Sequence, residues 1–551
     1  MRQLLAVILL TSFFRLFQLS VNPVGMYWDE LDTGYQAYSL LQTGRDYFGN
    51  LFPAHLQSFA DYRSGLYMYL TVPLVKLLGL TPVSVRLTAA AFSIVSVFLI
   101  YYLAKKHLGF GKFSWIPSLV IGLAPWMAIQ GRIAAESALL IPLILLGLIY
   151  FFSKRYSLSA LFFALTLWTY GTTKLFLPIL LILLVVTNLR RLNFRQLLIP
   201  GLIFAVVAFL PVFETFSKPV GRRMTEVSVL TDPTIKTQVD FQRLQAALGW
   251  GAARKLGMQP GLPEKITINK LTAWGQIMLG NYVSALSPEF LFLSGDPNLR
   301  HHIPAPLTGQ FYLIDLIAFV IGISFLLTAK NFQHRNLLLL WLLLSPLPSI
   351  ITRDGGNHAP RLIFEFIPVV LVISYGLKSL LSRRLLKFGY LAVLFCSLSF
   401  FYYYFFSTYK VISAPEFDTG FLPAVQTAVA NSSKYDRVIL DGANESLLMA
   451  YLFVARPNPA QFQKSFPLPS GKIIEGVEGY QFGNIVVLYP GIRNWSKITA
   501  SGSNFVVVST LSPGLENITS QDAVLGPDST PLFVTLEARS SGPIGTPDRE
   551  L

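Results

Sequence analysis

Three carboxylates stand close together early in the chain, as Asp29, Glu30 and Asp32. A carboxylate held beside a hydroxyl group can take its proton during a reaction and so act as a general base. Acidic residues in the first turn of a helix also stabilise that helix, because they cap its amide groups and interact favourably with its dipole. The residue pattern by itself favours this structural role, so a catalytic role needs further support.

The residues after this motif predict the helix that would carry it. Apolar and aromatic side chains recur at intervals of three or four residues, which places them on one stripe of a helix. These side chains are Leu31, Tyr35, Tyr38 and Leu41. We expect this helix to lie flat on the bilayer surface. A second amphipathic stretch covers residues 62–78 and begins next to Asp61, so the sequence predicts interfacial helices in this segment.

Charged residues near the ends of apolar stretches are candidates for binding an anion. Arg132 and Glu136 are four residues apart and would share one face of a helix, where the simplest interpretation is an ion pair. Lys174 follows the turn 170–173 between two apolar stretches. A lone lysine in such a place more often reaches lipid headgroups than binds a ligand.

A glycine-rich loop at residues 353–361 has the composition of a phosphate site. It carries an arginine at each end, with His358 close to Arg361. Arginine binds phosphate through two parallel hydrogen bonds. The pair His301 and His302 could instead bind a metal ion, but adjacent histidines on a strand or helix usually point apart, which argues against a shared ligand role.

The elements that must position these residues are membrane-spanning helices. Of 551 residues, 53% are hydrophobic and only 13% are charged, which is typical of polytopic membrane proteins and argues against a soluble multidomain enzyme. A helix needs roughly 20 apolar residues to cross a bilayer. The eleven stretches that approach this length are 3–19, 83–103, 114–130, 137–152, 158–170, 175–187, 196–216, 311–329, 336–352, 361–380 and 388–408.

Basic residues between these stretches are sorted to one side. Every second connection contains basic residues and no Asp or Glu. These basic residues are Lys105, Lys106, Lys112, Lys154, Arg155, Arg190, Arg191, Arg195, Lys330, Arg335, Arg383, Arg384 and Lys387. Because cytoplasmic loops are enriched in Lys and Arg, we expect these connections and the N-terminus to be cytoplasmic and the acidic motif to be external. The net charge of +15 then indicates contact with anionic membrane lipids and not with nucleic acid.

Three segments are expected outside the membrane on the same side. They are residues 21–80, 217–310 and 409–551. The last segment mixes strand-like runs such as 437–440 and 505–508 with Gly, Pro, Asn and Ser, which predicts a small extracytoplasmic α/β domain. We therefore expect an all-α polytopic membrane domain over residues 1–408 and a separate domain over residues 409–551.

A set of residues in the membrane part of the chain follows the pattern of a known superfamily. They are Trp28, Asp29, Glu30, Tyr38, Gly44, Pro53, Tyr67, Arg86 and Leu87 and, more loosely, Arg132 and segments 170–178, 287–292, 295–296 and 358–361. Over most of the membrane part the chain resembles the protein O-mannosyltransferase and aminoarabinose transferase superfamily, family 39-like membrane glycosyltransferases of the GT-C fold. The pair Asp29-Glu30 in the first external loop is the most specific element.

The resemblance implies an enzyme of the cell envelope that takes a sugar from a polyprenyl-phosphate donor in the membrane. The sugar is transferred, with inversion, to an acceptor on the external face. By this analogy Asp29 is the general base, a function worth roughly 10²–10⁴-fold in rate, and Glu30 assists it. The departing phosphate needs cations. The residues that the resemblance suggests for substrate binding are Asp32, Arg63, Arg132, Glu136, Lys174, His302, His358 and Arg361.

A metal ion is not required by this pattern. In the aminoarabinose branch a Glu-Lys-Pro-Pro segment follows the first helix, and the segment 62–65 matches it here. Arg63 keeps the cation, whereas Tyr62 replaces the carboxylate that helps to hold a metal in that branch. Asp61 is the nearest substitute. The resemblance therefore implies no required cofactor and assigns no metal ligand.

A polytopic lipid or lipid-linked glycan transporter or flippase is the main alternative. Transporters tend to show internal repeats with broken spans and ionisable residues at mid-membrane. The chain shows no such repeat, and Glu214 and Asp315 come nearest to mid-membrane charges. An oligosaccharyltransferase is a third alternative, but the Trp-Trp-Asp-Tyr-Gly signature is absent. The identities of the sugar and of the acceptor do not follow from these residues.

Overall fold

The structure is a computed structural model in which two compact units can be described. Unit 1 contains Met1–Phe17, Ala54–Tyr67 and Ala89–Phe405, and unit 2 contains Gln18–Pro53, Met68–Thr88 and Phe406–Leu551. The residues that the structure describes are 2–59, 61–249, 260–329, 332–442, 446–464, 471–474, 477–489, 502–512 and 522–538. The C-terminal end of the predicted domain at 409–551 therefore lies outside the described residues.

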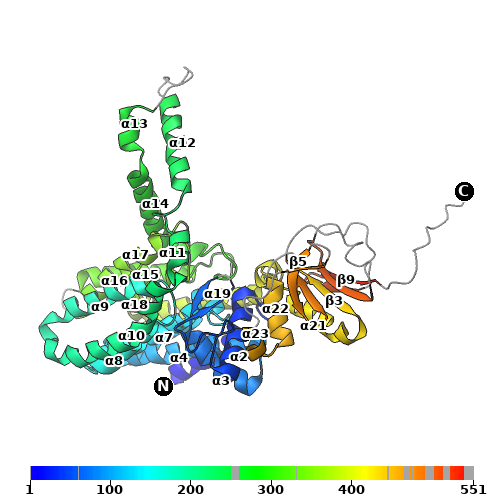
Figure 1. Cartoon of the computed structure of the whole chain (residues 1–551). Helices are drawn as coiled ribbons and strands as arrows, with labels where there is room; N and C mark the ends of the chain where they lie inside the picture. The colour runs from blue at the N-terminus through cyan, green and yellow to red at the C-terminus, as the bar shows by residue number, and fades with distance from the viewer. Residues whose placement is uncertain are drawn as a thin grey trace, which may run out of the picture. The chain divides into compact units, whose positions relative to one another are not determined.

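Unit 1 is built almost entirely from helices (Figure 1). Its helices in chain order are α1 (Arg2–Leu16), most of α4 (Pro82–Lys106), α5 (Trp115–Leu123), α6 (Pro125–Gln130), α7 (Leu140–Phe152), α8 (Tyr156–Thr166), α9 (Thr173–Asn188), α10 (Leu198–Ser217), α11 (Arg222–Val227), α12 (Thr234–Gly249), α13 (Leu262–Thr267), α14 (Lys270–Ala285), α15 (Leu313–Thr328), α16 (Arg335–Leu344), α17 (Leu347–Ile350), α18 (Ile363–Leu380) and α19 (Arg384–Phe406).

All eleven apolar stretches predicted from the sequence coincide with a helix or with two helices in series. Two stretches are interrupted, between α5 and α6 at Pro125 and between α16 and α17 at Pro346. Proline lacks the amide hydrogen that continues a helix, which accounts for both breaks. Within the described part of the chain, four helical segments are long and apolar enough to cross a membrane, and several shorter apolar helices accompany them. The count of eleven crossings stays a prediction.

Two glycines bring α15 and α18 into close contact. A methyl group on Gly322 would overlap the carbonyl oxygen of Val372, and one on Gly376 would overlap that of Ala318. Small residues at such positions let the backbones of two helices approach each other, as is common between helices in membranes. The two helices therefore form one tightly packed pair in unit 1.

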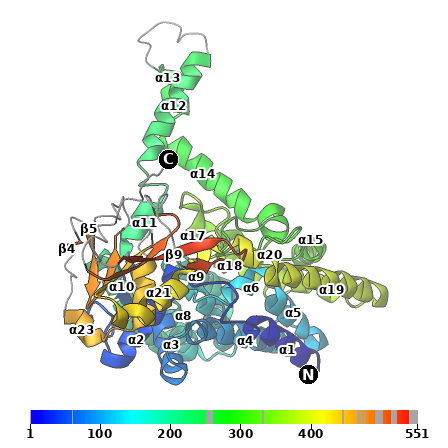
Figure 2. The ribbon, with the colours of Figure 1, turned by 90° about the vertical axis from the view of Figure 1, so that its right-hand side faces the viewer.

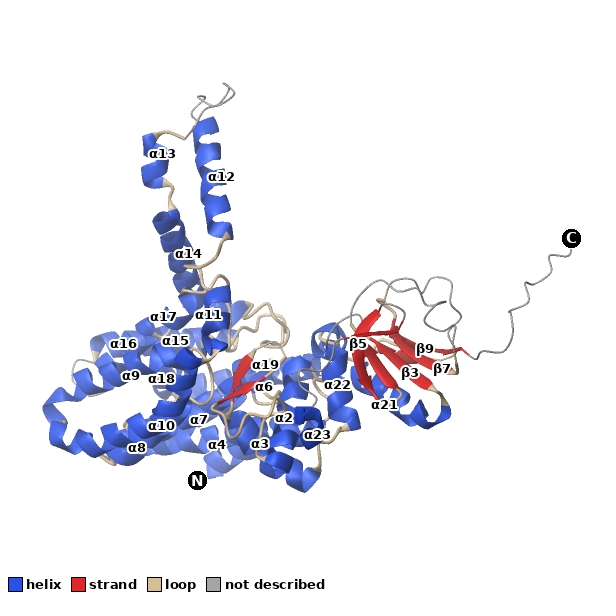
Figure 3. Ribbon diagram, viewed as in Figure 1, coloured by secondary structure: helices blue, strands red, loops and turns tan. Residues whose placement is uncertain are grey.

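A short β-hairpin follows the first external helix in the sequence. Strand β1 (His55–Gln57) pairs antiparallel with β2 (Tyr62–Ser64), and His55 lies opposite Ser64. Figure 3 shows these strands among the helices of unit 1. The prediction of an amphipathic helix over 62–78 was wrong for its first residues, because 62–64 are paired in this hairpin and α3 (Leu66–Leu78) begins only after it.

The predicted helical pair of Arg132 and Glu136 is also corrected by the structure. Helix α6 ends at Gln130, so the two residues do not share a helical face. Arg132 is fully buried and donates to the carbonyl oxygens of Phe14 and Phe17 at the end of α1, at 2.6 and 2.7 Å. Its guanidinium thus satisfies carbonyl groups that have no partner within α1.

Helices α12 and α14 project from the other helices of unit 1 (Figure 2). Both belong to the segment 217–310, which was predicted as an external loop. The side chain of Asn269 caps α14 in a capping box with Thr272, which fixes the start of this helix. Val239 and Ala273 belong to a small apolar cluster between the two helices. The segment is therefore an ordered helical arm in its described part.

Unit 2 contains a mixed sheet of seven strands in the order β4-β5-β6-β3-β7-β9-β8. The strands are β3 (Arg437–Asp441), β4 (Gly471–Ile474), β5 (Val477–Phe482), β6 (Ile485–Leu488), β7 (Asn504–Ser509), β8 (Ala523–Leu525) and β9 (Pro531–Ala538). The central strand β3 runs parallel to both β6 and β7. Its nearly continuous apolar sequence is typical of a strand buried on both faces. The sheet confirms the α/β character predicted for the C-terminal segment.

Unit 2 also contains several helices, one of which carries the acidic motif. They are α2 (Trp28–Thr43), α3 apart from its first two residues, α20 (Thr408–Ile412), α21 (Phe421–Asn431), α22 (Ser446–Ala455) and α23 (Pro459–Lys464). Helix α2 contacts α22 and α23. A methyl group on Gly34 would overlap the ring of Phe453, so only glycine allows this approach.

The predicted helix over the acidic motif is confirmed, but burial is not confined to one stripe of it. Leu31 and Tyr35 are fully buried, and so are polar residues on other faces, such as Gln36 and Ser39. The helix ends at Gly44, which adopts a left-handed conformation with φ of 67°, as glycine readily does. Helix α2 is therefore enclosed by protein in unit 2.

Candidate functional site

Glu30 is locked in a buried ion pair with Arg86 of α4. The guanidinium donates from Nε to Oε1 at 2.9 Å and from Nη2 to Oε2 at 2.8 Å. Both side chains are fully buried. The remaining Arg86 donors reach the carbonyl oxygens of Leu19, Pro23 and Gly25. Glu30 and Arg86 thus hold together α2, the start of α4 and the loop before α2 in unit 2.

Asp32 is fixed in a similar way two residues further along α2. It is fully buried and accepts a hydrogen bond of 2.6 Å from the hydroxyl of Tyr47. Asp29, by contrast, is only partly buried. The N-cap of α2 is Tyr27, which makes no side-chain capping bond. Of the three carboxylates, Asp29 is therefore the one that is not fully buried.

In unit 1, Lys174 belongs to a chain of polar contacts that begins at the β-hairpin. Lys174 Nζ lies 3.0 Å from His55 Nε2, and His55 Nδ1 lies 3.1 Å from an oxygen of Glu214. The same oxygen accepts the backbone amide of His55 at 2.7 Å. Lys218 donates to the other Glu214 oxygen at 2.8 Å. Two ammonium groups, one carboxylate and one imidazole are thus connected.

These contacts determine the state of His55. An ammonium group can only donate, so His55 Nε2 accepts from Lys174 and Nδ1 carries the hydrogen that goes to Glu214. Burial lowers the pKa of His55, and the charge of Lys174 lowers this pKa further, although Glu214 opposes both. The ring is therefore neutral at physiological pH, and the network keeps one excess positive charge.

Arg63 lies on the second strand of the same hairpin. Its guanidinium is 2.8 Å from a carboxylate oxygen of Glu136, and the two side chains are 10% and 12% exposed. The hairpin register holds Arg63 opposite Leu56, next to His55. The predicted residues Arg63, Glu136 and Lys174 are thus all positioned by, or paired with, the elements around this hairpin, whereas Arg132 is held at the end of α1.

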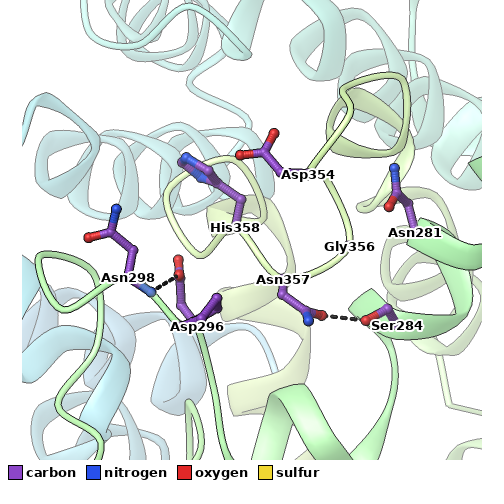
Figure 4. Close-up of a pocket in the computed structure, with 9 residues that line it drawn as sticks. Asn281, Ser284, Asp296, Asn298, Asp354, Gly356, Asn357 and His358 are labelled. Atoms are coloured by element: carbon purple, nitrogen blue, oxygen red, sulfur yellow. Dashed lines mark hydrogen bonds between the residues drawn. The ribbon is translucent and has the colours of Figure 1, made fainter. Parts of the chain in front are cut away.

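The loop 353–361 lines a polar pocket of about 320 Å³. Figure 4 shows His358 and Asp354 of this loop facing the pocket, with Asn281 and Ser284 of α14 on another side. The lining is completed by Asp296, Pro297, Asn298, Gly356 and Asn357. Ser284 is hydrogen-bonded to Asn357. The predicted phosphate-binding Arg361 donates to Asp354 and, at 2.9 Å, to Thr352.

Asp296, His301 and His358 meet beside this pocket. His301 Nδ1 lies 2.9 Å from Asp296 Oδ2, and the two imidazole rings are 4.7 Å apart. Burial opposes ionisation of Asp296, but hydrogen bonds from His301 and from the backbone lower its pKa below the usual value. Within the described residues, these three side chains are the only group of at least three His, Cys, Asp or Glu whose ligand atoms could hold one metal ion.

His302 points away from its neighbour and into the protein. It is fully buried, and its Nε2 donates to the carbonyl oxygen of Thr308 at 3.1 Å. Its ring lies against Gly295, which has a φ of 72°. The sequence argument that adjacent histidines point apart is therefore correct here, and it is His301 that joins the residues beside the pocket.

The burial of His302 predicts a loss of stability in acid. Burial lowers its pKa from 6.5 to about 4, and its Nδ1 has no hydrogen-bond partner among the described residues. Below pH 6.5 the His302 imidazole binds a proton in the unfolded chain but not in the folded chain. The free energy of unfolding therefore falls as the pH decreases to 4, by on the order of 3 kcal/mol. We expect the unfolding temperature of His302→Gln to depend less on pH over this range than that of the wild type. Equal dependence in scanning fluorimetry would contradict this.

Sequence reasoning did not assign His55, Glu214 or Asp296 to a site, and it considered His301 only as half of a metal pair with His302. His55 is a lone histidine between predicted helices, and Glu214 was noted only as one of the two charges nearest to mid-membrane. Asp296 and His301 are joined to His358 by folding across about sixty residues. The segment 295–296 was part of the motif pattern, which is the one signal that pointed toward Asp296.

Comparisons with known proteins give a fold likeness. No family model matches the chain, and no curated protein matches its sequence. Among solved structures, ArnT from Cupriavidus metallidurans bound to undecaprenyl phosphate is similar at 13% identity with a TM-score of 0.44, covering 98% of both chains. The Archaeoglobus fulgidus oligosaccharyltransferase in the apo form is similar at 10% identity with a TM-score of 0.47, covering 82% of this chain and 63% of that chain.

Proposed function

We propose that this chain is an integral-membrane inverting glycosyltransferase that moves a sugar from a polyprenyl-phosphate donor to an acceptor hydroxyl on the external face. Asp29 is the general base in this proposal. One observation carries it: the two carboxylates that follow in the sequence, Glu30 and Asp32, are fully buried in hydrogen bonds, whereas Asp29 stays partly accessible. The Asp-Glu motif resemblance and the charge-sorted loops support the same assignment.

The rigidity of α2 supports the role of Asp29. A general base is effective when it is held within hydrogen-bond reach of the proton that it removes. The Glu30 to Arg86 pair and the Asp32 to Tyr47 bond fix the first turn of α2 in unit 2. Asp29 is consequently presented on a backbone that does not have to reorganise when the substrate arrives, which lowers the barrier of the reaction.

The proposed reaction is a single displacement. The acceptor oxygen attacks the anomeric carbon, and its proton passes to the carboxylate of Asp29. The bond between the anomeric carbon and the phosphate oxygen breaks, and the electron pair leaves with the polyprenyl phosphate. The products are the glycosylated acceptor, with inverted configuration at the sugar, and the free polyprenyl phosphate.

The leaving phosphate requires stabilisation of its negative charge, for which preorganised cations are well suited. Lys174 and Arg63 are the proposed cations. Lys174 is oriented by His55, so its remaining hydrogens are available to an anion, and its network has a net positive charge. Arg63 is held in place by Glu136. Arg132 and His302 are buried in bonds to backbone carbonyl groups, and they support the fold in this proposal.

The proposed function is tested with membranes that contain the full chain and a panel of radiolabelled polyprenyl-phosphate sugars. Time-dependent appearance of label in a new glycosidic product that is stable to the mild acid that cleaves the donor, together with release of free polyprenyl phosphate, is the expected result for at least one donor. A flippase would change the side on which the labelled lipid is found and leave its sugar attached. Movement of intact donor without bond formation would therefore replace the glycosyltransferase proposal with the transporter alternative.

A further inference from the structure

We propose that the arm formed by α12, α13 and α14 lies on the membrane and inserts its exposed apolar side chains into the headgroup region of the bilayer, at the level where α17 ends. The arm belongs to unit 1 and projects from the other helices of that unit (Figure 2). The glycosyl transfer proposed above assigns no role to these side chains. The inference therefore stands whether or not the chain transfers a sugar.

One face of α14 is apolar and open. Leu271, Leu279 and Val283 are separated by multiples of four residues, which places them on one side of the helix. Their exposed fractions are 73%, 64% and 60%. Gly275 lies between them on the same side, and a methyl group added there would meet no atom within 4 Å. The described part of the chain thus leaves this open face of α14 uncovered.

The two other helices of the arm also expose large apolar side chains. In α12 these are Phe241 and Leu244, and in α13 they are Leu262 and Ile266, with exposed fractions between 46% and 72%. The buried side of α12 includes Val239 and faces the small apolar cluster that it shares with α14. Single exposed apolar residues are normal on a protein surface, whereas a concentration of them marks a surface that contacts a partner or a membrane.

The base of α14 lies beside helices that the sequence predicts to cross the bilayer. The hydroxyl of Tyr282 donates to the carbonyl oxygen of Leu343 in α16 at 2.9 Å. The side chain of Asn281 donates to the carbonyl oxygen of Ile350, the last residue of α17, at 3.0 Å. The seven residues from Leu343 to Ile350 span roughly 10 Å along a helix. The last turns of α14 are therefore at the depth where the apolar stretch 336–352 ends.

The apolar surface of the arm is continuous with that of α16. Leu340 and Leu343 of α16 are 38% and 49% exposed, as is expected of side chains that face lipid. The contact of Tyr282 with Leu343 joins this surface to α14. Tryptophan and tyrosine are enriched where a bilayer meets water, and α14 carries Trp274 and Tyr282. A bilayer around α16 would therefore also reach α14, which favours lipid over a protein partner as the cover of its open face.

The charges of the arm also fit a lipid surface. The one charged residue of α14 is Lys270, at its first position. Lys270, Lys265 in α13 and Lys236 in α12 are all exposed. The described helices of the arm contain four basic residues and two acidic ones. Basic residues beside an exposed apolar face are typical of helices that lie in the bilayer interface and attract anionic headgroups.

The test places a nitroxide label on the arm of the full chain in lipid nanodiscs that contain phosphatidylcholine and phosphatidylglycerol. The single cysteine, Cys396, is replaced by serine, and a new cysteine is introduced by Leu279→Cys or by Val283→Cys. Electron paramagnetic resonance measures how often the label collides with oxygen, which concentrates in lipid, and with a water-soluble nickel complex. We expect the ratio of oxygen to nickel collisions at both positions to approach that of a label on the native Cys396, which is exposed on α19.

Asp522→Cys, in the same serine background, provides the aqueous reference, because Asp522 is exposed on unit 2. Its label should collide mainly with the nickel complex. Labels at Leu279 and Val283 that behave like the label at position 522 would overturn the proposal. Exclusion of both reagents from these two positions would also overturn it, since a second copy of the chain or another protein would then cover the open face of α14.

Discussion

Asp29→Asn is expected to lower the rate of sugar transfer by ~10²–10⁴-fold, the range that a general base contributes. Asparagine has nearly the same shape as aspartate but cannot accept the proton of the attacking hydroxyl. Because Glu30 and Asp32 are held by Arg86 and Tyr47, neither is free to rotate and replace the missing base. Donor binding should remain largely intact, since the proposed phosphate ligands are other residues.

The measurement compares initial rates and donor binding in reconstituted membranes. Asp522→Asn is the matched control, because it removes one carboxylate from an exposed position next to strand β8 and should leave the rate unchanged. Unfolding temperatures of both variants should equal that of the wild type. Full activity of Asp29→Asn would remove this residue as the base, even if sugar transfer itself had been demonstrated.

Arg86→Met should destabilise the folded protein by about 3–5 kcal/mol, because it leaves the carboxylate of Glu30 buried without its partner. The carbonyl oxygens of Leu19, Pro23 and Gly25 lose a donor at the same time. Methionine has a comparable length, so the effect reports lost hydrogen bonds and charge compensation more than lost volume. Thermal unfolding in detergent measures it.

The double variant Glu30→Gln/Arg86→Met separates the charge from the packing. Removing both charges of a buried pair is often much less harmful than removing one, so the double variant should recover part of the lost stability. An Arg86→Met protein as stable as the wild type would mean that the pair does not hold the start of α2. Lys218→Met serves as a control, since its partner Glu214 keeps other hydrogen bonds.

Sequence reasoning succeeded where one local property dominates. Apolar stretches of sufficient length formed helices throughout unit 1, because a backbone in an apolar environment must satisfy its hydrogen bonds internally. The periodicity after Leu31 correctly indicated α2, and the β-rich runs became β3 and β7. These elements depend on neighbours in the chain, which a sequence displays directly.

Sequence reasoning failed where the chain changes direction or where residues distant in the sequence come into contact. The spacing of Arg132 and Glu136 suggested one helical face, but the helix ends before Gly131, and each residue found a different partner. Residues 62–64 look amphipathic and are paired in a hairpin. The contact of Lys174 with His55, and that of His358 with His301, join residues from remote segments, and no local pattern encodes such pairs.

The glycine contact between α15 and α18 has a consequence for the loops that precede these helices. The loop with Asp296 leads into α15, and the loop with His358 leads into α18. Since Gly322 and Gly376 allow the two backbones to pack closely, they also fix the relative position of the two helices from which both loops extend. A bulky side chain introduced at either glycine would push the two helices apart. This displacement would increase the distance between the carboxylate of Asp296 and the imidazole of His358.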